Sequence, residues 1–489
     1  MIGLAITQSV MLAACDDSSQ SNLNVGTVLY TETEFADDQI PQSSYLEKES
    51  DSVEEPEASI PRTDQAPSQL SSHYIQDSDI PSDRAVRIID EIGTFDENNY
   101  SVYAKEGGWL LGADSDKNIL VLSNNGNDVK RIAKDGNETI VFHNLLTNQN
   151  HMLDSIAWDG EDYIAWAECR RPTESEIEDG SDWEINILNI QTGEKLQIAK
   201  DNGIRPEIGS AYYYLCPTKI ANVDGFVSYV TFAQREDGQI VQAIALYEIA
   251  LKQHRIIYYL DGDPKENGLG YPSIGSGYVA WAQAYIRPQD GLYEGYTLLY
   301  DLSTQKITIL ESTENIINPC IADGWIVCEN HPNETYYDGQ IVAYQIERNA
   351  WIYKISAEYP DYYSLSTLGV SLCFPSSWGS FITWHGSPLS SVIVMDLQSG
   401  TLYKIVENAF SVKEVLLYPG GLLAWFEQYK NDAGETEQCL RYCFLKKEET
   451  VRRRYKYEDQ NLDLCPGRFA VYRLPGSAGR YGKRPAEEN

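Results

Sequence analysis

The chain has 489 residues and a formal net charge of −35, with 34 Tyr and 10 Trp residues against 4 Met. The negative charge argues against nucleic-acid binding and against adsorption to anionic lipid surfaces, because both depend on clustered Lys and Arg side chains. It also favours a soluble monomer. The excess of Tyr and Trp over Met favours pleated, half-buried strands and argues against a helical bundle.

Residues 1–15 predict export and a lipid anchor. They form an apolar run, too short to span a bilayer as a helix, that ends in Leu-Ala-Ala-Cys at Cys15. This ending resembles the bacterial lipoprotein signal, the lipobox. The resemblance implies cleavage before Cys15, a diacylglycerol on its thiol, and an exported, outward-facing protein held at the cell membrane by that lipid alone. The run lacks the basic residue with which signal peptides begin, so a basic stretch upstream of the given start stays an open alternative.

Residues 16–83 are predicted to form an acidic, disordered tether. They contain 16 Asp or Glu residues against Lys48 and Arg62, which accounts for −14 of the net charge. Ser, Gln and Pro are frequent, and no apolar period is sustained. Such a segment cannot bury enough apolar surface to offset its ordering entropy, and repulsion between its like charges extends it.

The body of the chain repeats one pattern, a turn residue followed by an apolar strand that ends near Ala-Trp. The clearest copy is Gly-Tyr-Val-Ala-Trp at 277–281. Most copies are followed by a hairpin with a polar tip, such as Ser-Gly at 399–400. Most are preceded by a short segment, such as 271–274, that we expect to be an innermost strand. The other copies lie at 162–166, 225–229, 324–328, 380–384 and 421–425, with weaker ones at 108–112 and 468–472.

Four short strands in about 40–50 residues are typical of one blade of a β-propeller, so the sequence predicts an all-β fold. Eight copies predict eight four-stranded blades, and seven is the alternative if a weak terminal copy only covers the ring. The last copy supplies two strands, whereas 83–90 forms a strand-like segment without a partner nearby in the sequence. We therefore expect an N-terminal strand to close the ring, with the propeller over 84–473 and a flexible tail over 474–489. The recurring Trp residues are expected to fill the seams between blades.

The repeats resemble TolB-type propeller repeats over about residues 98–473. The resemblance is carried by a strand of the form Pro-x-x-(Ser/Asp)-Gly and a hairpin of the form Tyr-Asp-(Leu/Ile)-x-(Thr/Ser)-Gly, as in Tyr300-Asp301-Leu302. It implies a propeller but no particular function, because propellers serve as enzymes, receptors and scaffolds alike.

Long loops at 170–182, 285–294, 331–339 and 428–435 should share one face of the propeller with the connections between blades. Function is often carried by long loops on a rigid frame, so we expect a ligand at this face. Polar side chains that recur two positions after Ala-Trp should point toward it at one height, although they also fit solvated strand ends. The candidate ligand-binding residues there are Glu168, Arg170, Gln283, Tyr285, Arg287, Asn330, His331, His385 and Glu427.

These features predict a surface-tethered binding or scaffold protein whose partner is an envelope protein or a glycan. Two alternatives stay open: a carbohydrate-active enzyme, glycosidase or lyase, that uses Glu168 and Glu427, and a structural component of an envelope assembly. No catalytic residues, cofactor or metal site are predicted. The six His are dispersed, and the acidic motifs at 114–118 and 261–263 lack the order of a calcium loop. The cysteines of the body form no CxxC pair and are expected to be free thiols, with disulfides as the alternative.

Overall fold

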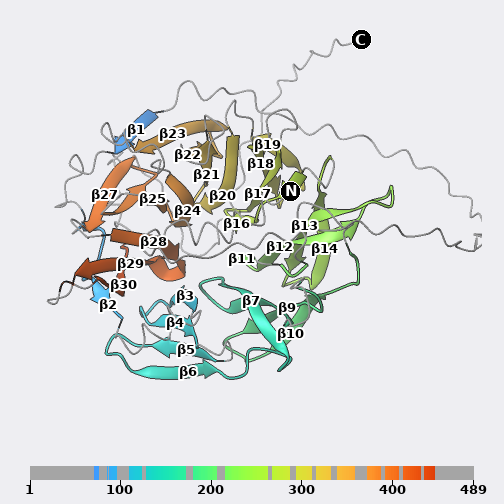
Figure 1. Cartoon of the computed structure of the whole chain (residues 1–489), viewed down its shortest axis with the longest axis horizontal. Coiled ribbons are helices and arrows are strands. Elements are labelled where there is room, and N and C mark those ends of the chain that lie inside the picture. Colours follow the sequence, from blue (N-terminus) through green and yellow to red (C-terminus); the bar gives the residue numbers. More distant parts are fainter. Residues whose placement is uncertain are drawn as a thin grey trace, which may run out of the picture. The chain divides into compact units, whose positions relative to one another are not determined.

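The computed structural model is built from seven small antiparallel sheets, which we call blades 1 to 7 in chain order (Figure 1). Their innermost strands contact one another in sequence, and the last contacts the first, so the blades form a closed ring. The all-β propeller fold is therefore confirmed. The structure describes residues 71–75, 85, 87–95, 109–123, 128–171, 180–205, 215–217, 219–262, 267–286, 293–310, 315–331, 339–357, 372–386, 391–406, 411–430, 434 and 436–446.

Apart from two N-terminal strands described below, each blade runs outward from the axis in the order of the chain, from an innermost to an outermost strand. Blade 1 consists of β3 (Trp109–Ala113), β4 (Ile119–Leu122), β5 (Val129–Ile132) and β6 (Glu138–Phe142). Blade 2 consists of β7 (His151–Trp158), β8 (Tyr163–Arg170), β9 (Glu184–Asn189) and β10 (Lys195–Lys200). Blade 3 consists of β11 (Ala221–Val223), β12 (Phe226–Gln234), β13 (Ile240–Glu248) and β14 (Gln253–Tyr259). Blade 4 consists of β15 (Asn267–Leu269) and β16 (Ser273–Gly275), which share the inner edge, followed by β17 (Tyr278–Ile286), β18 (Tyr293–Asp301) and β19 (Ile307–Leu310).

The remaining three blades repeat this order. Blade 5 consists of β20 (Asn315–Ala322), β21 (Trp325–His331), β22 (Gln340–Gln345) and β23 (Ala350–Ala357). Blade 6 consists of β24 (Leu372–Trp378), β25 (Phe381–Gly386), β26 (Val392–Asp396) and β27 (Thr401–Val406). Blade 7 consists of β28 (Ser411–Tyr418), a 3₁₀ turn η6 (Pro419–Gly421), β29 (Leu422–Lys430) and β30 (Thr436–Phe444).

An N-terminal strand closes the ring, as the sequence predicted, but it lies at 93–94 and not at 83–90. Among the described residues of 83–90, only Ile89 takes part in β-pairing. Strand β2 (Gly93–Thr94) pairs with β30 as the fourth strand of blade 7, and the bridge between Ile89 and Leu445 extends this pairing. Ala85 and Ile88 are buried in the seam between blades 6 and 7. Because β2 already completes the seventh blade, the preferred count of eight is corrected to the alternative of seven.

The error in the count came from the weak copies of the repeat. The copy at 108–112 was interpreted as a second strand, but β3 is the innermost strand of blade 1. A five-residue apolar run looks the same in both positions, and only its pairing partner distinguishes them. The copy at 468–472 and the proposed tail at 474–489 lie outside the described residues.

Strand β1 (Ser71–Ile75) lies within the segment 16–83, for which no regular structure was expected. It pairs in parallel with β23, from Ser71 opposite Tyr353 to Ile75 opposite Ala357, and adds a fifth strand to blade 5. The outer edge of a blade offers unpaired backbone groups that can recruit another strand. The expectation of disorder is therefore corrected for these five residues, while the rest of 16–83 lies outside the description.

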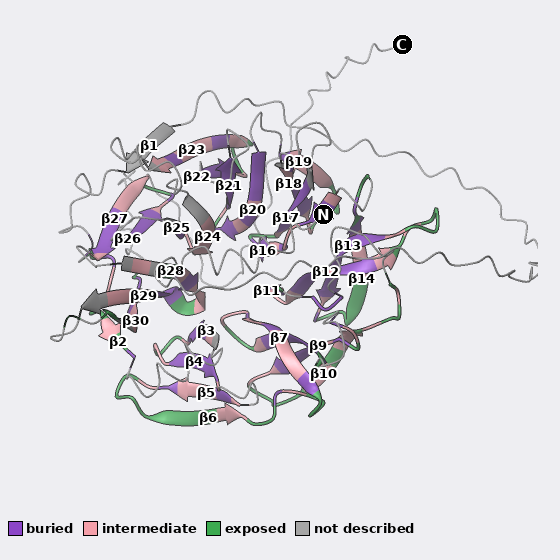
Figure 2. Ribbon diagram, viewed as in Figure 1, coloured by how far each residue is buried: buried purple, intermediate pink, exposed green. Residues whose placement is uncertain are grey.

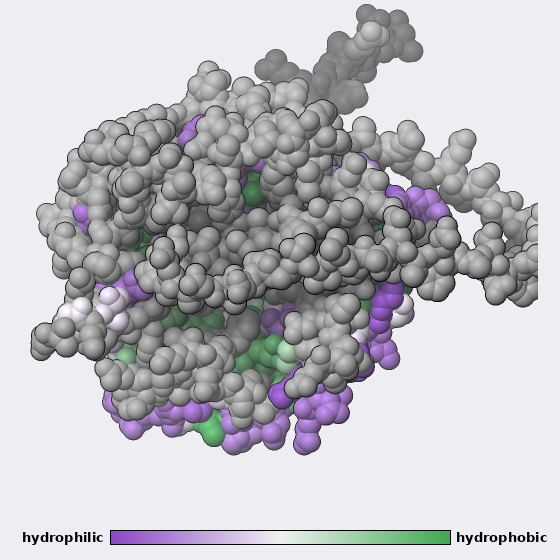
Figure 3. All heavy atoms as spheres, in the orientation of Figure 1, coloured by the Kyte–Doolittle hydropathy of each residue, from purple (hydrophilic) through white to green (hydrophobic). Residues whose placement is uncertain are grey.

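The recurring Trp side chains fill the seams between blades, as expected. Trp166, Trp281 and Trp425 are all 0% exposed, and they pack in the clusters between blades 1 and 2, 3 and 4, and 6 and 7. The outermost strand β6 is largely exposed (Figure 2), and hydrophilic side chains line the outer edge of blades 1 and 2 (Figure 3). The faces of the blades are thus buried against neighbouring blades, whereas the outer edge of blade 1 is open to solvent.

Serine hydroxyls join the innermost strands of successive blades. Ser155 Oγ accepts a hydrogen bond from the backbone N–H of Ile220 at 3.0 Å, and Ser273 Oγ accepts one from Ile321 at 3.1 Å. Ser376 Oγ accepts a third from Leu417 at 2.9 Å. These bonds satisfy backbone donors that the inner edge of each sheet leaves without a strand partner. They hold the inner strands around the axis, where the cavity described below lies.

Candidate functional site

The strand order divides the loops between two faces of the propeller. Turns that join the first strand to the second, and the third to the fourth, lie on one face, which we call the short-turn face. Loops that join the second strand to the third, and each blade to the next, lie on the other, which we call the connection face. The predicted ligand-binding residues were assigned to the connection face.

Glu168 lies near the end of β8 that meets the connection face, but its side chain is 0% exposed. Its carboxylate accepts hydrogen bonds from the backbone N–H and the hydroxyl of Thr147, and from Trp166 Nε1 at 2.9 Å. His151 Nδ1 lies 3.3 Å from the same carboxylate. Glu168 therefore holds the segment that enters blade 2, and it offers no surface to a ligand.

Gln283 has the same role between blades 3 and 4. Its side chain is 3% exposed, and its Oε1 accepts hydrogen bonds from the Tyr258 hydroxyl at 2.8 Å and from the backbone N–H of Asp261 at 3.4 Å. Glu329, which the sequence analysis did not single out, accepts bonds from Asn318 Nδ2 and the backbone N–H of Phe374 in the same manner. Carboxylates and amides at these positions thus anchor the connections between blades.

The remaining candidates divide into buried, paired and undescribed groups. Asn330 and His331 are 0% and 4% exposed, and His331 Nε2 lies 3.3 Å from Glu329 Oε2. Glu427 accepts a hydrogen bond from Trp425 Nε1 at 3.3 Å and pairs with Arg441. Arg170 is exposed and donates to Ser181 Oγ. Arg287 and the side chains of Tyr285 and His385 lie outside the described residues.

Glu168 and Glu427 lie at equivalent positions of their blades, because the Trp two positions before each of them donates a hydrogen bond to its carboxylate. However, the structure places Glu168, Gln283, Asn330 and His331 inside the seams rather than on a rim. Their contact with a ligand stays a prediction that their burial does not support.

A large cavity of about 1060 Å³ lies instead at the axis on the short-turn face. All seven blades contribute to its wall, mainly through the turn between their first and second strands. These turns include 114–117, 159–162, 224, 276, 323, 379 and 419–420. The size is that of a site for a small molecule or a short peptide segment.

The charged side chains of this cavity are mostly acidic. Among the described residues of its wall there are two cations, and both are already paired. Lys117 pairs with Asp90, and Arg131 Nε lies 3.2 Å from Asp114 Oδ2. The carboxylates of the wall are Asp114, Asp159, Glu161, Asp162, Asp224 and Asp323.

The carboxylates differ in how they are bound by the protein. Asp159 Oδ1 accepts backbone hydrogen bonds from Glu161 at 2.8 Å and Tyr163 at 3.0 Å, while burial is the largest influence and raises the pKa of Asp159. Asp224 and Asp323 are exposed at their turns, and within the described part of the chain neither carboxylate has a cationic partner. The cavity therefore presents negative charge that the protein itself does not neutralise.

Asn222 adds a buried polar group to the cavity wall. Its side chain is 2% exposed, and its Nδ2 donates to the carbonyl oxygens of Ala157 at 3.2 Å and Tyr163 at 2.7 Å. Its Oδ1 has no hydrogen-bond partner among the described residues. An unpaired buried acceptor costs free energy, so a donor that reached it would be favoured.

The sequence analysis missed this site, although the repeat contained its signal. The turn before each second strand carries Asp-Gly at 159–160, 224–225 and 323–324, and Ser-Gly at 276–277. Equivalent turns of a propeller gather around one axis, so a recurring acidic turn residue predicts an acidic ring. The motif at 114–118 forms a turn, in which Asp114 Oδ1 accepts hydrogen bonds from the backbone N–H groups of Asp116 and Asn118.

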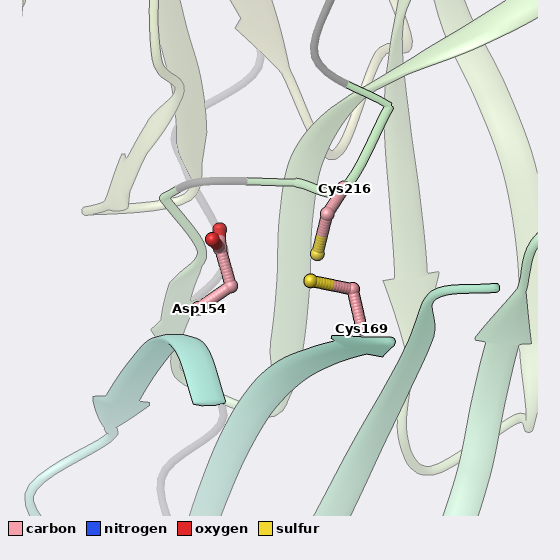
Figure 4. A group of neighbouring side chains, drawn as sticks. All are labelled: Asp154, Cys169 and Cys216. Atoms are coloured by element: carbon pink, nitrogen blue, oxygen red, sulfur yellow. The ribbon is translucent and has the colours of Figure 1, made fainter. Parts of the chain in front are cut away.

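A second group of chemically reactive side chains lies in blade 2, where Asp154, Cys169 and Cys216 have their carboxylate and sulfur atoms within 4.8 Å of one another (Figure 4). Neither Cys169 nor Cys216 forms a disulfide, and the same holds for Cys320, Cys328, Cys439 and Cys443. Burial is the largest influence on Cys216 and raises its pKa, and the neighbouring Cys169 and Asp154 raise it further.

No protein-family model and no curated protein matches the sequence. Among solved structures, the chain is similar to oligogalacturonate lyase from Vibrio parahaemolyticus, with 9% identity, a TM-score of 0.41, and coverage of 73% of this chain and 96% of that one. The β-propeller domain of Cps50 (Swd1) from Myceliophteria thermophila has 8% identity, a TM-score of 0.39, and coverage of 73% and 99%. TolB from Acinetobacter baumannii has 12% identity, a TM-score of 0.32, and coverage of 69% and 79%. At these values the likenesses carry no argument about activity or ligand, and the propeller assignment depends on the sheet order above.

Proposed function

We propose that this protein is a binding protein whose central cavity, on the short-turn face, takes a basic peptide segment of a partner protein. The observation that carries the proposal is the cavity of about 1060 Å³, walled by all seven blades and by six carboxylates. Among the described residues of the wall, the two cations, Lys117 and Arg131, are already paired. Ammonium and guanidinium groups are the natural partners of such a wall. A ring of rigid sheets keeps the carboxylates in place before the ligand arrives, which lowers the entropic cost of binding.

A ligand site on the connection face has less support than the cavity on the short-turn face. The polar residues predicted to bind a ligand there, Glu168 and Gln283, are buried and bonded to the segments between blades. The same observation weighs against the carbohydrate-active enzyme, because a carboxylate that holds Thr147 inside a seam is not positioned to meet a glycosidic bond.

Asp224→Asn together with Asp323→Asn is expected to weaken binding of a short Lys- and Arg-containing peptide by about 5- to 30-fold, because each near-surface carboxylate contributes on the order of 0.5–1 kcal/mol toward a cation. Asn tolerates the positive φ of 52° at position 224, so the fold should be unchanged. Isothermal titration calorimetry at two salt concentrations would measure the loss.

Asp237→Asn is the matched control. Asp237 lies in the tight turn between β12 and β13 on the connection face, so the control should bind the basic peptide like the unmodified protein. An acidic peptide of equal length and a neutral oligosaccharide serve as ligand controls. Equal binding of acidic and basic peptides, or full binding by the double variant, would refute the proposal.

We further propose that Cys15 carries a lipid that tethers the propeller to the outer side of a cell membrane. Residues 1–15 lie outside the described part of the chain, and the support is the lipobox-like ending at Cys15. Among the described residues, none belongs to a helix long and apolar enough to cross a membrane.

Cys15→Ser is expected to move the protein from the membrane fraction to the soluble exported fraction and to abolish incorporation of radiolabelled palmitate. Fractionation of bacteria that express either form, followed by immunoblotting, would measure the shift. A Cys465→Ser control should remain with the membranes and keep its label. Retention of the Cys15 variant in the membrane fraction would show that another element anchors the chain.

A further inference from the structure

We propose that Asp154, Cys169 and Cys216 form a binding site for one zinc ion in blade 2. The group is separate from the axial cavity, none of whose wall residues belongs to it. Cys169 lies on β8, Asp154 on β7, and Cys216 in the segment between β10 and β11 that leads into blade 3. Figure 4 shows the two sulfur atoms facing each other with the carboxylate of Asp154 beside them.

The backbone places Asp154 out of the regular strand ladder. The register of β7 against β8 shifts between Leu153, opposite Glu168, and Ser155, opposite Ala167, so Asp154 is the extra residue of a β-bulge. A bulge changes the direction in which a side chain leaves the sheet, and bulges are frequent beside functional sites. Here the bulge accompanies a carboxylate that lies beside two sulfurs from other segments of the chain.

The distances suit a zinc ion after a small closure. Zinc binds thiolate sulfur at about 2.3 Å and carboxylate oxygen at about 2.0–2.2 Å in tetrahedral geometry, which puts its donor atoms about 3.5–3.8 Å apart. The three donor atoms lie within 4.8 Å of one another, so each pair of donor atoms needs to approach by at most about 1.3 Å. Three protein donors leave one coordination position for water, a common arrangement for zinc.

The donor set selects the metal. Two sulfurs favour zinc or another soft cation over calcium and magnesium, which prefer oxygen. Cys169 is 0% and Cys216 3% exposed, so a bound ion would be shielded from solvent. A disulfide would use the same two sulfurs, but it would leave the carboxylate facing sulfur lone pairs. A cation is instead attracted by all three groups, which is why the geometry favours metal binding.

The binding step is balanced without any oxidant. Zn²⁺ replaces the protons of the two thiols, the carboxylate of Asp154 adds as an anion, and two protons pass to solvent for each ion bound. The resulting site has a charge of −1 from one dication, two thiolates and one carboxylate. Because Cys216 belongs to the segment between blades 2 and 3, the ion would also fasten this segment to blade 2 and stabilise the folded ring.

The test uses the full chain, purified reduced and free of metal, with Zn²⁺ and Co²⁺ as probes. We expect one Zn²⁺ per chain with release of two protons, a rise in Tm with zinc concentration, and a thiolate-to-cobalt charge-transfer absorption with Co²⁺. Cys169→Ser and Cys216→Ser should abolish the charge-transfer band. Asp154→Asn, which keeps the size of the side chain, should weaken zinc binding while circular dichroism stays unchanged.

Cys443→Ser is the matched control, since Cys443 is a free cysteine buried in the strand β30 of another blade. It should keep the full cobalt spectrum. The proposal is overturned if the unmodified reduced protein shows no charge-transfer band, or if the band survives in both Cys169→Ser and Cys216→Ser. A disulfide between Cys169 and Cys216 in the isolated protein, combined with no zinc uptake after reduction, would also overturn it and assign the pair to a disulfide.

Discussion

A chain that begins at residue 96 should lose the cooperative unfolding transition of the propeller, whereas chains that begin at residue 71 or 84 should keep it. The longer chains retain β2, the fourth strand of blade 7, together with Ile88 and Phe95, which are 0% and 6% exposed. Losing a buried Ile or Phe side chain costs about 2–5 kcal/mol each. Their joint loss with the strand approaches the whole stability of an ordinary domain, about 5–15 kcal/mol.

Urea denaturation followed by tryptophan fluorescence would compare the three lengths. The chain that begins at residue 84 is the matched control, because it lacks β1 but keeps the closing segment. We expect it to unfold slightly earlier than the chain that begins at residue 71. A sharp transition of unchanged midpoint in the chain that begins at residue 96 would show that the ring does not depend on its N-terminal closure.

Trp281→Ala should lower the free energy of unfolding by about 3–5 kcal/mol. The indole is 0% exposed and packs with Val279, Leu298 and Tyr300, and its ring centre lies 5.3 Å from that of Tyr258 across the seam between blades 3 and 4. Truncation would leave a cavity between two sheets that cannot close around it, because each is held by its own strand pairing.

Trp281→Phe should cost clearly less, since a ring still fills the seam. Trp281 Nε1 is buried without a hydrogen-bond partner among the described residues, so the Phe variant also removes an unsatisfied donor. Leu251→Ala, at a side chain that is 64% exposed, serves as the control and should change stability by less than about 0.5 kcal/mol. Equal losses for the Ala and Phe variants would contradict a packing role for this residue.

The repeat could be recognised in the sequence because a strand that is buried on both faces is a short, continuous apolar run bounded by turn residues. The run at 277–281 became part of β17, and the hairpin with its tip at 399–400 became the two outer strands of blade 6. These are local properties, set by apolar runs, turn residues and the need to cover a sheet on both sides. The number of blades was not local, since it depended on which strand the segment at 108–112 pairs with and on where the N-terminal strand closes the ring.

The candidate site was also only partly predictable from the sequence, because it depends on contacts between distant segments. The equivalence of Glu168 and Glu427 was predictable from their spacing to Trp166 and Trp425, and the Trp-to-carboxylate hydrogen bonds confirm it. Their exposure was not predictable, because Glu168 is covered by Thr147, which precedes it by 21 positions and belongs to the incoming connection. In the sequence, the acidic residues at 159–160, 224–225 and 323–324 have the pattern of ordinary turns between strands. Only the closed ring shows that these turns lie around one axis.

By itself, the sequence determined an all-β chain of repeated four-stranded units, with Trp residues in the seams and an N-terminal strand as the closing element. Those features follow from patterns within about 50 residues, the length of one blade. The tertiary structure alone decided that there are seven blades, that the acidic turns enclose a cavity, and that Asp154, Cys169 and Cys216 meet. Each of these depends on contacts between segments far apart in the chain, and such contacts are set by the closure of the whole ring rather than by any local preference.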